Sequence, residues 1–370
     1  MNYFKNLLAK SLRQRSFVVT LIAAFFIGVG SAVYLKVMEP INVQAEITMQ
    51  KAQALRLVDS YQNYPNESAE KKATYQLLLE NSTLASRQVS NLIMEEFPRF
   101  NRTSEELAAV QLKLWNTRFP DKASLQPIWQ LQQNQVVSSQ LVEEEKSPVL
   151  TADNTQTAVA LVIQLMLGFG FLLMAFFASD NLLEEKRHFT LIHAYPQIFP
   201  IRMISKVGVK VIGHLAAIGV LIVGIFLTMA VIGQLGDWSY PTAVYYRQTW
   251  HAWPFWLYFL LAMVLLTALL FVTELLGFVV NVLIPNRYVS FFILCLCYGI
   301  GTLSSLPFSK YSPFAVFDLQ KIITGEFAVT SQGTLGLGGA LLLFLLWGMG
   351  AILFLIFADK KNWLQKGVFQ

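Results

Sequence analysis

The sequence has little charge for its length, and this scarcity alone excludes an ordinary soluble protein. Asp, Glu, Lys and Arg make up 14% of its 370 residues, against 55% hydrophobic residues, whereas soluble globular domains average about 25% charged residues. The composition therefore predicts a polytopic membrane protein. Most of the net charge of +5 lies beside apolar runs, so we assign it to anionic lipid headgroups and membrane orientation rather than to nucleic acid.

Cysteine is nearly absent. Cys295 and Cys297 lie two residues apart in one apolar run, so on a helix they point to different sides. We interpret both as packing residues rather than as metal or redox groups. The sequence offers no disulfide framework for an external domain, which must therefore fold by packing alone.

The motifs of several catalytic machineries are also missing. The glycines between 333 and 339 are followed by no lysine, so they form no phosphate-binding loop of the kind that holds ATP. The sequence contains no His-Glu-x-x-His helix, paired Cys motif or Gly-x-Ser-x-Gly elbow, which argues against a membrane protease or lipid hydrolase. We expect no catalytic residue, no metal and no cofactor in this chain.

Apolar segments are abundant, and they predict an all-α integral membrane protein with six transmembrane helices. Residues 1–16 place Phe4, Leu7, Leu8 and Leu12 on one helical face, as in an amphipathic helix lying in the inner interface. Residues 17–38 form transmembrane helix 1, since about 20 apolar residues span a bilayer. Transmembrane helices 2–6 lie within 156–370, at about 157–178, 207–235, 255–284, 288–306 and 335–357.

Residues 39–155 regain charged and amide side chains and predict a helical extracytoplasmic domain. One long amphipathic helix breaks near Phe97, a second covers 104–117 with a capping box at Thr103, and a third covers about 127–145. Strand signals are weak in this domain. Between the third and fourth spans, a cluster of Trp and Tyr residues predicts a short outer loop at the headgroup boundary.

The basic residues fix the expected orientation. Lys and Arg in the short flanks number twelve on one side and three on the other, and cytoplasmic loops are enriched in both residues. We therefore expect a multi-pass protein of the cell membrane with both termini in the cytoplasm.

The loop 179–206, between the second and third spans, is dense in charge. Its basic residues place it on the cytoplasmic side, and Pro196 stops a short apolar segment that begins at Phe189. Such a segment predicts a short helix lying across the membrane face, where it could dock on a partner. The plain alternative is a solvated loop that only joins two spans.

The order of Glu185, Thr190, an apolar patch, Pro196 and Lys206 resembles the corresponding loop of type-2 ABC transporter permeases. In that family the loop holds the coupling helix, which rests on the ATP-binding subunit. The resemblance implies that the ATPase contact is made by these residues: Glu185, Phe189, Thr190, Leu191, Ile192, Tyr195, Pro196 and Lys206.

A second segment resembles the same family. Tyr311, Pro313 and Phe314, followed by Asp318, look like its outer segment between the fifth and sixth spans, where a broken helix re-enters the membrane. The resemblance covers the membrane part of the chain, and residues 39–155 have no such match.

Four polar residues stand inside the expected spans: Gln164, His214, Glu274 and Asn281. Such groups are costly in hydrocarbon and usually face protein or water. His214 and Glu274 lie at similar depth, about 12 to 15 Å from the inner surface at 1.5 Å per residue. They form either a structural hydrogen bond between helices or a gate or substrate contact.

The resemblance implies the membrane-spanning subunit of an ATP-driven exporter. It would work as a homodimer or heterodimer of permease subunits, with two ATP-binding subunits that bind ATP and Mg. The cargo would be a hydrophobic peptide, an antibiotic or a lipid-like molecule. The alternative is a non-transporting membrane sensor or immunity protein with a ligand-binding external domain; a secondary transporter is disfavoured because no repeat of the spans is obvious.

Overall fold

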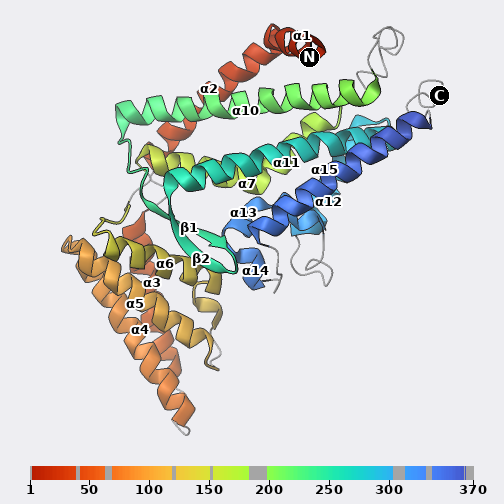
Figure 1. Ribbon diagram of the computed structural model, residues 1–370. Helices are drawn as coiled ribbons and strands as arrows, with labels where there is room; N and C mark the ends of the chain where they lie inside the picture. The colour runs from red at the N-terminus through yellow and green to blue at the C-terminus, as the bar shows by residue number, and fades with distance from the viewer. Residues whose placement is uncertain are drawn as a thin grey trace.

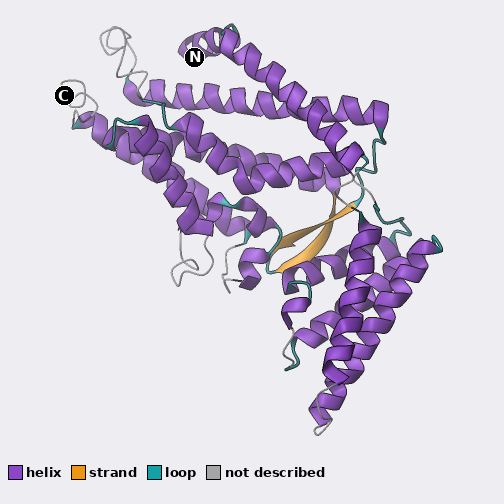
Figure 2. Ribbon diagram, turned by 180° about the vertical axis from the view of Figure 1, so that it is seen from behind, coloured by secondary structure: helices purple, strands orange, loops and turns teal. Residues whose placement is uncertain are grey.

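The computed structural model describes residues 2–38, 42–62, 69–118, 122–150, 153–182, 198–302, 313–330, 336–361 and 363. Long helices lie side by side, α3–α6 form a separate group at one end, and a hairpin lies between the two parts (Figures 1 and 2). The elements are α1 (Asn2–Leu12), α2 (Arg15–Met38), α3 (Val43–Gln62), α4 (Ala69–Ile93), α5 (Phe97–Trp115), η1 (Lys122–Ser124), α6 (Ile128–Glu143), α7 (Thr155–Ala178), α10 (Phe199–Ile232), β1 (Pro241–Tyr246), β2 (Thr249–Pro254), α11 (Phe255–Leu283), α12 (Arg287–Thr302), η3 (Pro313–Phe317), α13 (Leu319–Ile323), α14 (Glu326–Thr330) and α15 (Leu337–Lys360).

Five helices of the described chain are long and apolar enough to cross a membrane: α2, α7, α10, α11 and α15. The expectation of a helical, multi-pass membrane protein is therefore confirmed. The fifth expected span corresponds to α12, which has 16 residues and a length of about 24 Å. A bilayer core is about 30 Å thick, so the described part of α12 does not reach across it by itself, and the six-span plan stays a prediction.

Helix α10 begins earlier than the sequence predicted. We expected a span from about 207, but α10 starts at Phe199, with Pro200 in its first turn, where proline is favoured because its fixed φ suits a helix and its missing N–H is not needed. Lys206, assigned to the loop, therefore lies in a helix. The 34 residues of α10 extend about 51 Å, well beyond a bilayer core.

Small residues bring α2 and α10 into close contact. The buried residues Ala24, Gly28 and Ala32 follow one another at intervals of four along α2, which places them on one face. A Cβ added at Gly28 would lie 2.2 Å from the carbonyl oxygen of Leu221, and one at Gly224 would lie 2.6 Å from that of Phe25. This is the small-residue packing by which membrane helices associate closely.

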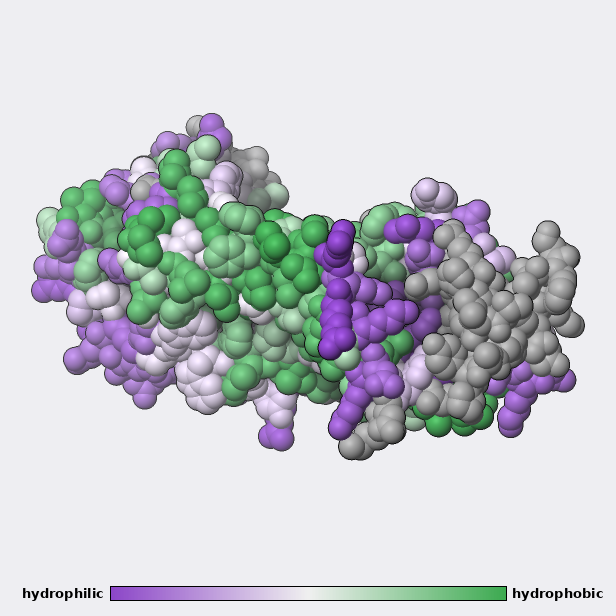
Figure 3. Space-filling view, turned by 90° about the horizontal axis from the view of Figure 1, so that it is seen from above, coloured by the Kyte–Doolittle hydropathy of each residue, from purple (hydrophilic) through white to green (hydrophobic). Residues whose placement is uncertain are grey.

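The outer face of these helices is apolar. Figure 3 shows apolar side chains gathered on the middle of one face, between hydrophilic residues at its two ends. On α2 the exposed side chains include Val19 and Phe26, and on α10 they include Val223 and Val231. Helix α1 packs on α10, with the ring of Phe4 near Gly208. A surface of this kind suits lipid contact.

Helices α3–α6 form a four-helix group with its own core. The largest separate cluster includes Leu57, Leu78 and Leu114. The predicted helix start at Thr103 is wrong: α5 begins at Phe97 with a proline in its first turn, because Pro98 opens this helix rather than only ending the previous one. The Thr103 hydroxyl is buried and accepts a hydrogen bond from the Asn91 side chain at 3.0 Å.

The aromatic outer loop contains a β-hairpin that the sequence analysis did not predict. Strands β1 and β2 pair antiparallel around Arg247 and Gln248, which have φ values of 49° and 66°. Hairpin turns with positive φ usually carry Asn or Gly, so this pair gave no turn signal. The Trp250 indole donates to the Thr324 carbonyl at 3.0 Å, which joins the hairpin to the segment before α15.

A polar contact joins the four-helix group to the membrane part. The Lys146 ammonium lies 2.9 Å from a Glu144 oxygen and 3.0 Å from an Asp237 oxygen, and it donates to the Ser239 hydroxyl at 2.7 Å. The hydrogen bond from Lys146 lowers the pKa of Glu144, so the pair is charged at neutral pH.

We predict that a fragment from Val43 to Leu150 folds alone as a helical domain, because its core is built from its own helices. In this fragment Leu114→Ala, at a side chain with no exposure, should lower the free energy of unfolding by about 2–5 kcal/mol. Leu79→Ala, at a side chain 41% exposed, should change the free energy of unfolding by no more than about 0.5 kcal/mol. Circular dichroism melts measure both. Equal effects of the two variants, or a spectrum without helix, would contradict the assignment.

Candidate functional site

The residues expected to contact an ATPase fall mostly outside the described chain. Residues 183–197, which include Glu185, Phe189, Thr190, Leu191, Ile192, Tyr195 and Pro196, lie outside it, and Lys206 lies near the start of α10. The structure does describe both ends of this segment: Ser179 to Leu182 after α7, and Ile198 before α10. The candidate site lies where the first of these ends meets α10 and α11.

Glu274 is the centre of the site. Its side chain has no exposed surface, and it lies on α11 among residues of three segments. One carboxylate oxygen is 3.1 Å from His214 Nε2, and the other accepts a hydrogen bond from the Asn181 side chain at 2.7 Å. The structure thus brings together His214 and Glu274, which the sequence could place only at similar depth.

Lys210 contributes a positive charge beside the Glu274 carboxylate. Its ammonium lies 3.9 Å from the same Glu274 oxygen that Asn181 contacts, and it also donates to the Asn181 side-chain oxygen. A buried carboxylate is strongly unfavourable unless it is paired and hydrogen-bonded. Here one cation, one amide and one imidazole surround it, so removal of any of the three leaves the carboxylate less well compensated.

Asn181 and Asn281 tie the chain after α7 to α11. The Asn181 amide also donates to the Glu274 carbonyl at 2.9 Å. The Asn281 amide donates to the Ser179 carbonyl at 2.9 Å and to the Ser290 hydroxyl of α12 at 2.8 Å, while its oxygen accepts from the Leu182 N–H at 3.1 Å. Three of the four residues that precede the undescribed segment, Ser179, Asn181 and Leu182, are therefore held by side chains of α11.

Gly277 allows this arrangement. A Cβ added there would lie 2.3 Å from the Ala178 carbonyl oxygen, so α7 and α11 cross with their backbones almost in contact. Glu274, Gly277 and Asn281 recur at intervals of three and four, which places them on one face of α11. That spacing is visible in the sequence, and it could have linked Glu274 to Asn281.

Two residues of the cluster escaped the sequence analysis. Asn181 carries an uncharged amide in a charged loop, and Lys210 follows other basic residues at the start of a span. Neither pattern distinguishes a buried partner from a solvated side chain. Within the described chain no group of three or more His, Cys, Asp or Glu side chains could hold a metal ion.

The outer segment between α12 and α15 is broken into short helices. Tyr311 lies outside the described residues, and Pro313 begins η3. The Phe314 carbonyl would be 2.2 Å from a Cβ at Gly301, so the chain returns directly against α12. Phe317 is fully buried and stacks on Phe171 of α7 at 4.1 Å.

Asp318 has a local structural role in this segment. Its side chain caps α13 by accepting from the Lys321 N–H at 3.4 Å, and it lies 3.8 Å from the Lys321 ammonium. Among the residues expected in the outer segment, the structure thus gives Phe314 a packing role, against Trp347 at 5.3 Å, and gives Asp318 a capping role.

Comparison with known proteins identifies no relative: no protein family, curated protein or solved structure matches the chain. The functional argument therefore depends on the residues and contacts of the chain itself.

We predict that Gly277→Ala loosens the crossing of α7 and α11, because the added methyl group meets the backbone of Ala178. Such overpacking should cost about 1–3 kcal/mol and lower the thermal midpoint of the purified protein. Gly348→Ala in α15 is the matched control, since nothing lies within 4 Å of its added Cβ. Equal melting of the two variants would show that the crossing is not tight.

Proposed function

We propose that the chain is the membrane-spanning permease subunit of an ATP-driven exporter in the cell membrane, with both termini in the cytoplasm. It pairs with a second permease subunit, and two separate ATP-binding subunits supply ATP and Mg. The cargo is a hydrophobic peptide, antibiotic or lipid-like molecule. This assignment begins from the resemblance of loop 179–206 and of the segment around Tyr311 to type-2 ABC permeases.

The observation that carries the proposal is the cluster around Glu274. The residues leading into the proposed coupling segment are tied to α11 through Asn181 and Asn281, and to α10 through Lys210. A permease driven by another subunit needs a stiff connection from its docking loop to its helices. Hydrogen bonds that are fully buried supply such a connection, because breaking one leaves polar groups unpaired in an apolar surrounding.

Two further features support the same assignment. In the part of the sequence where the resemblance implies a re-entrant helix, η3 packs against α12 and α13 packs against α7. The amphipathic α1 lies against α10. Figure 1 places α1, the start of α10 and the end of α15 toward one end of the long helices, and the hairpin and α3–α6 toward the other.

In this mechanism ATP binding closes the partner subunits and moves the segment 183–197. The displacement passes from Leu182 and Asn181 to α11, and Lys210 and His214 of α10 follow the Glu274 carboxylate. The two helices then shift together and change access to the cargo path.

A second candidate function is a non-transporting sensor, which is favoured by a cavity between α3–α6 and the membrane part. The two functions differ in their partners. A permease co-purifies with an ATP-binding chain and stimulates its ATPase activity in the presence of cargo, whereas a sensor does neither.

We predict that Leu191→Asp releases the ATP-binding subunit, because an unpaired charge buried in an apolar contact is strongly unfavourable. Co-purification should fall at least about tenfold, equivalent to about 1.4 kcal/mol. Leu79→Asp is the control: it introduces the same charge at an exposed leucine of α4. Undiminished co-purification of the Leu191 variant would refute the docking assignment.

We predict that Glu274→Gln lowers cargo-stimulated ATPase activity but leaves the permease bound to its ATP-binding subunit. Gln keeps the size of the side chain and can still bond Asn181, and an interhelical polar contact contributes only about 0.6 kcal/mol. Lys210 is 36% exposed and can be solvated when the carboxylate charge is lost. Co-purification should therefore persist, while cargo-stimulated ATPase activity falls.

Glu106→Gln, at an exposed residue of α5, is the matched control and should leave both quantities unchanged. The opposite result for Glu274→Gln, poor assembly with normal activity per assembled complex, would assign the cluster a purely structural role.

A further inference from the structure

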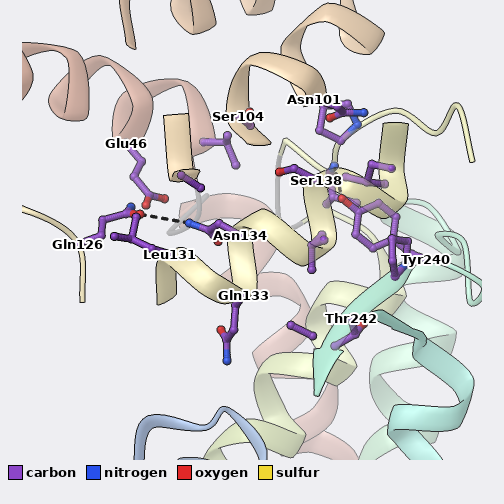
Figure 4. A pocket seen from close by; sticks show the side chains of 18 of the residues that line it. Glu46, Asn101, Ser104, Gln126, Leu131, Gln133, Asn134, Ser138, Tyr240 and Thr242 are labelled. Carbon is purple, nitrogen blue, oxygen red and sulfur yellow. Dashed lines mark hydrogen bonds between the residues drawn. The ribbon is translucent and has the colours of Figure 1, made fainter. Parts of the chain in front are cut away.

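A cavity of about 470 Å³ lies between the four-helix group and the membrane part. Its walls include residues of α3, α4, α5 and α6 on one side and of α7, β1 and α11 on the other. Figure 4 shows Glu46 of α3, Ser104 of α5, Asn134 of α6 and Tyr240 of the loop before β1 around it. The volume lies within the range of about 300–1,000 Å³ that is typical of sites for small ligands.

The lining mixes apolar side chains with amides and hydroxyls, and it is almost uncharged. Ten of its residues are Asn or Gln, and among the described residues that line it Glu46 is the one charged side chain. Lys and Arg are absent from these lining residues, so a phosphate or carboxylate would find no cation there. The apolar part of the wall includes Phe100, Leu131 and Tyr258. The chemistry favours a neutral ligand with apolar side groups and hydrogen-bonding groups between them.

Two buried acceptors in the lining lack a partner. Gln88 and Gln156 are only 6% and 5% exposed, and the side-chain oxygen of each has no hydrogen-bond partner among the described residues. A buried acceptor without a partner is unfavourable, because it has lost its hydrogen bonds to water. Because the terminal torsion of Gln has a broad preference, a small rotation presents either oxygen to a molecule in the cavity.

Other side-chain amides that line the cavity already have hydrogen-bond partners within the chain, unlike the oxygens of Gln88 and Gln156. The Asn134 amide donates to the Gln126 side-chain oxygen at 3.1 Å, as the dashed line in Figure 4 shows, and the Gln133 amide donates to the Thr324 carbonyl at 2.7 Å. The Gln88 amide donates to the Ser104 hydroxyl at 2.8 Å. The side-chain oxygens of Gln88 and Gln156 can therefore accept hydrogen bonds from the N–H or O–H groups of a bound molecule.

We propose that this cavity binds a short uncharged peptide segment, whose backbone N–H groups donate to the side-chain oxygens of Gln88 and Gln156. Its apolar side chains pack against Phe100, Leu131 and Tyr258. A peptide backbone offers N–H donors at regular intervals and carries no charge, which matches both the unsatisfied oxygens and the absence of cations. The inference does not depend on transport, and binding is measured without an ATP-binding subunit.

The test uses the full chain in lipid nanodiscs and a short capped peptide of alternating leucine and serine. Microscale thermophoresis should show saturable binding beyond that of protein-free nanodiscs. Gln156→Met, which keeps the size but removes the acceptor, should weaken binding about five-fold, the equivalent of one hydrogen bond. Gln88→Met gives a second, independent measurement.

Gln132→Met is the matched control. The Gln132 oxygen is also buried without a partner among the described residues, yet Gln132 does not line the cavity. This variant should bind the peptide as the unaltered protein does. A peptide with N-methylated backbone amides should bind weakly to all of the proteins, with no difference between them.

The outcomes separate the alternatives. Absence of saturable binding, or equal weakening by the substitutions at 132, 88 and 156, overturns the proposal. Binding of a neutral trisaccharide in place of the peptide overturns the assignment to peptides. Loss of ATPase co-purification in the Leu191 variant is a separate result and has no bearing on this site.

Discussion

The burial of the Glu274 carboxylate is the constraint on which the membrane part of this structure depends. A charged group without water must gather its partners from nearby helices, and here these come from α10 and from the chain that follows α7. Satisfying one carboxylate therefore fixes three segments relative to one another. Asn281, two turns further along α11, also joins separate segments: its side-chain amide donates to the Ser179 carbonyl after α7 and to the Ser290 hydroxyl of α12.

Close backbone contact makes these bonds possible. Gly277 lets α7 approach α11, as Gly28 and Gly224 let α2 approach α10. In a bilayer there is little hydrophobic drive between helices, so close packing and polar contacts decide which helices associate. The two crossings leave apolar side chains such as Phe26 and Val231 on the outside, where lipid is the favourable surrounding.

Sequence periodicity predicted the features that depend on local composition and could not predict those that depend on pairing. Hydropathy located the long apolar helices to within a few residues, because a bilayer imposes a length on any apolar helix, except at the start of α10, which lies eight residues before the expected position. It could not reveal that Asn181 bonds Glu274, since an amide in a loop has the same local sequence whether it is buried or solvated. The hairpin escaped because Arg247 and Gln248 adopt positive φ without a glycine. The start of α5 was misplaced because Pro98 serves as a helix opener in this context.

Helices α7 and α11 extend from one candidate site to the other. Gln156 at the start of α7 and Tyr258 in α11 line the cavity, while Ser179 after α7 and Glu274 in α11 belong to the buried cluster. Interactions at either site act on the same two helices, and these cross tightly at Gly277. If the two helices have two arrangements, the proposed peptide, by preferring one of them, would also change the affinity for the ATP-binding subunit that we propose docks on residues 183–197. Linkage requires the partner to change peptide affinity by the same factor. The tight crossing of α7 and α11 can transmit a displacement from the cavity to the Glu274 cluster. A loosely packed crossing would let side chains rearrange locally, and the helices would not move together.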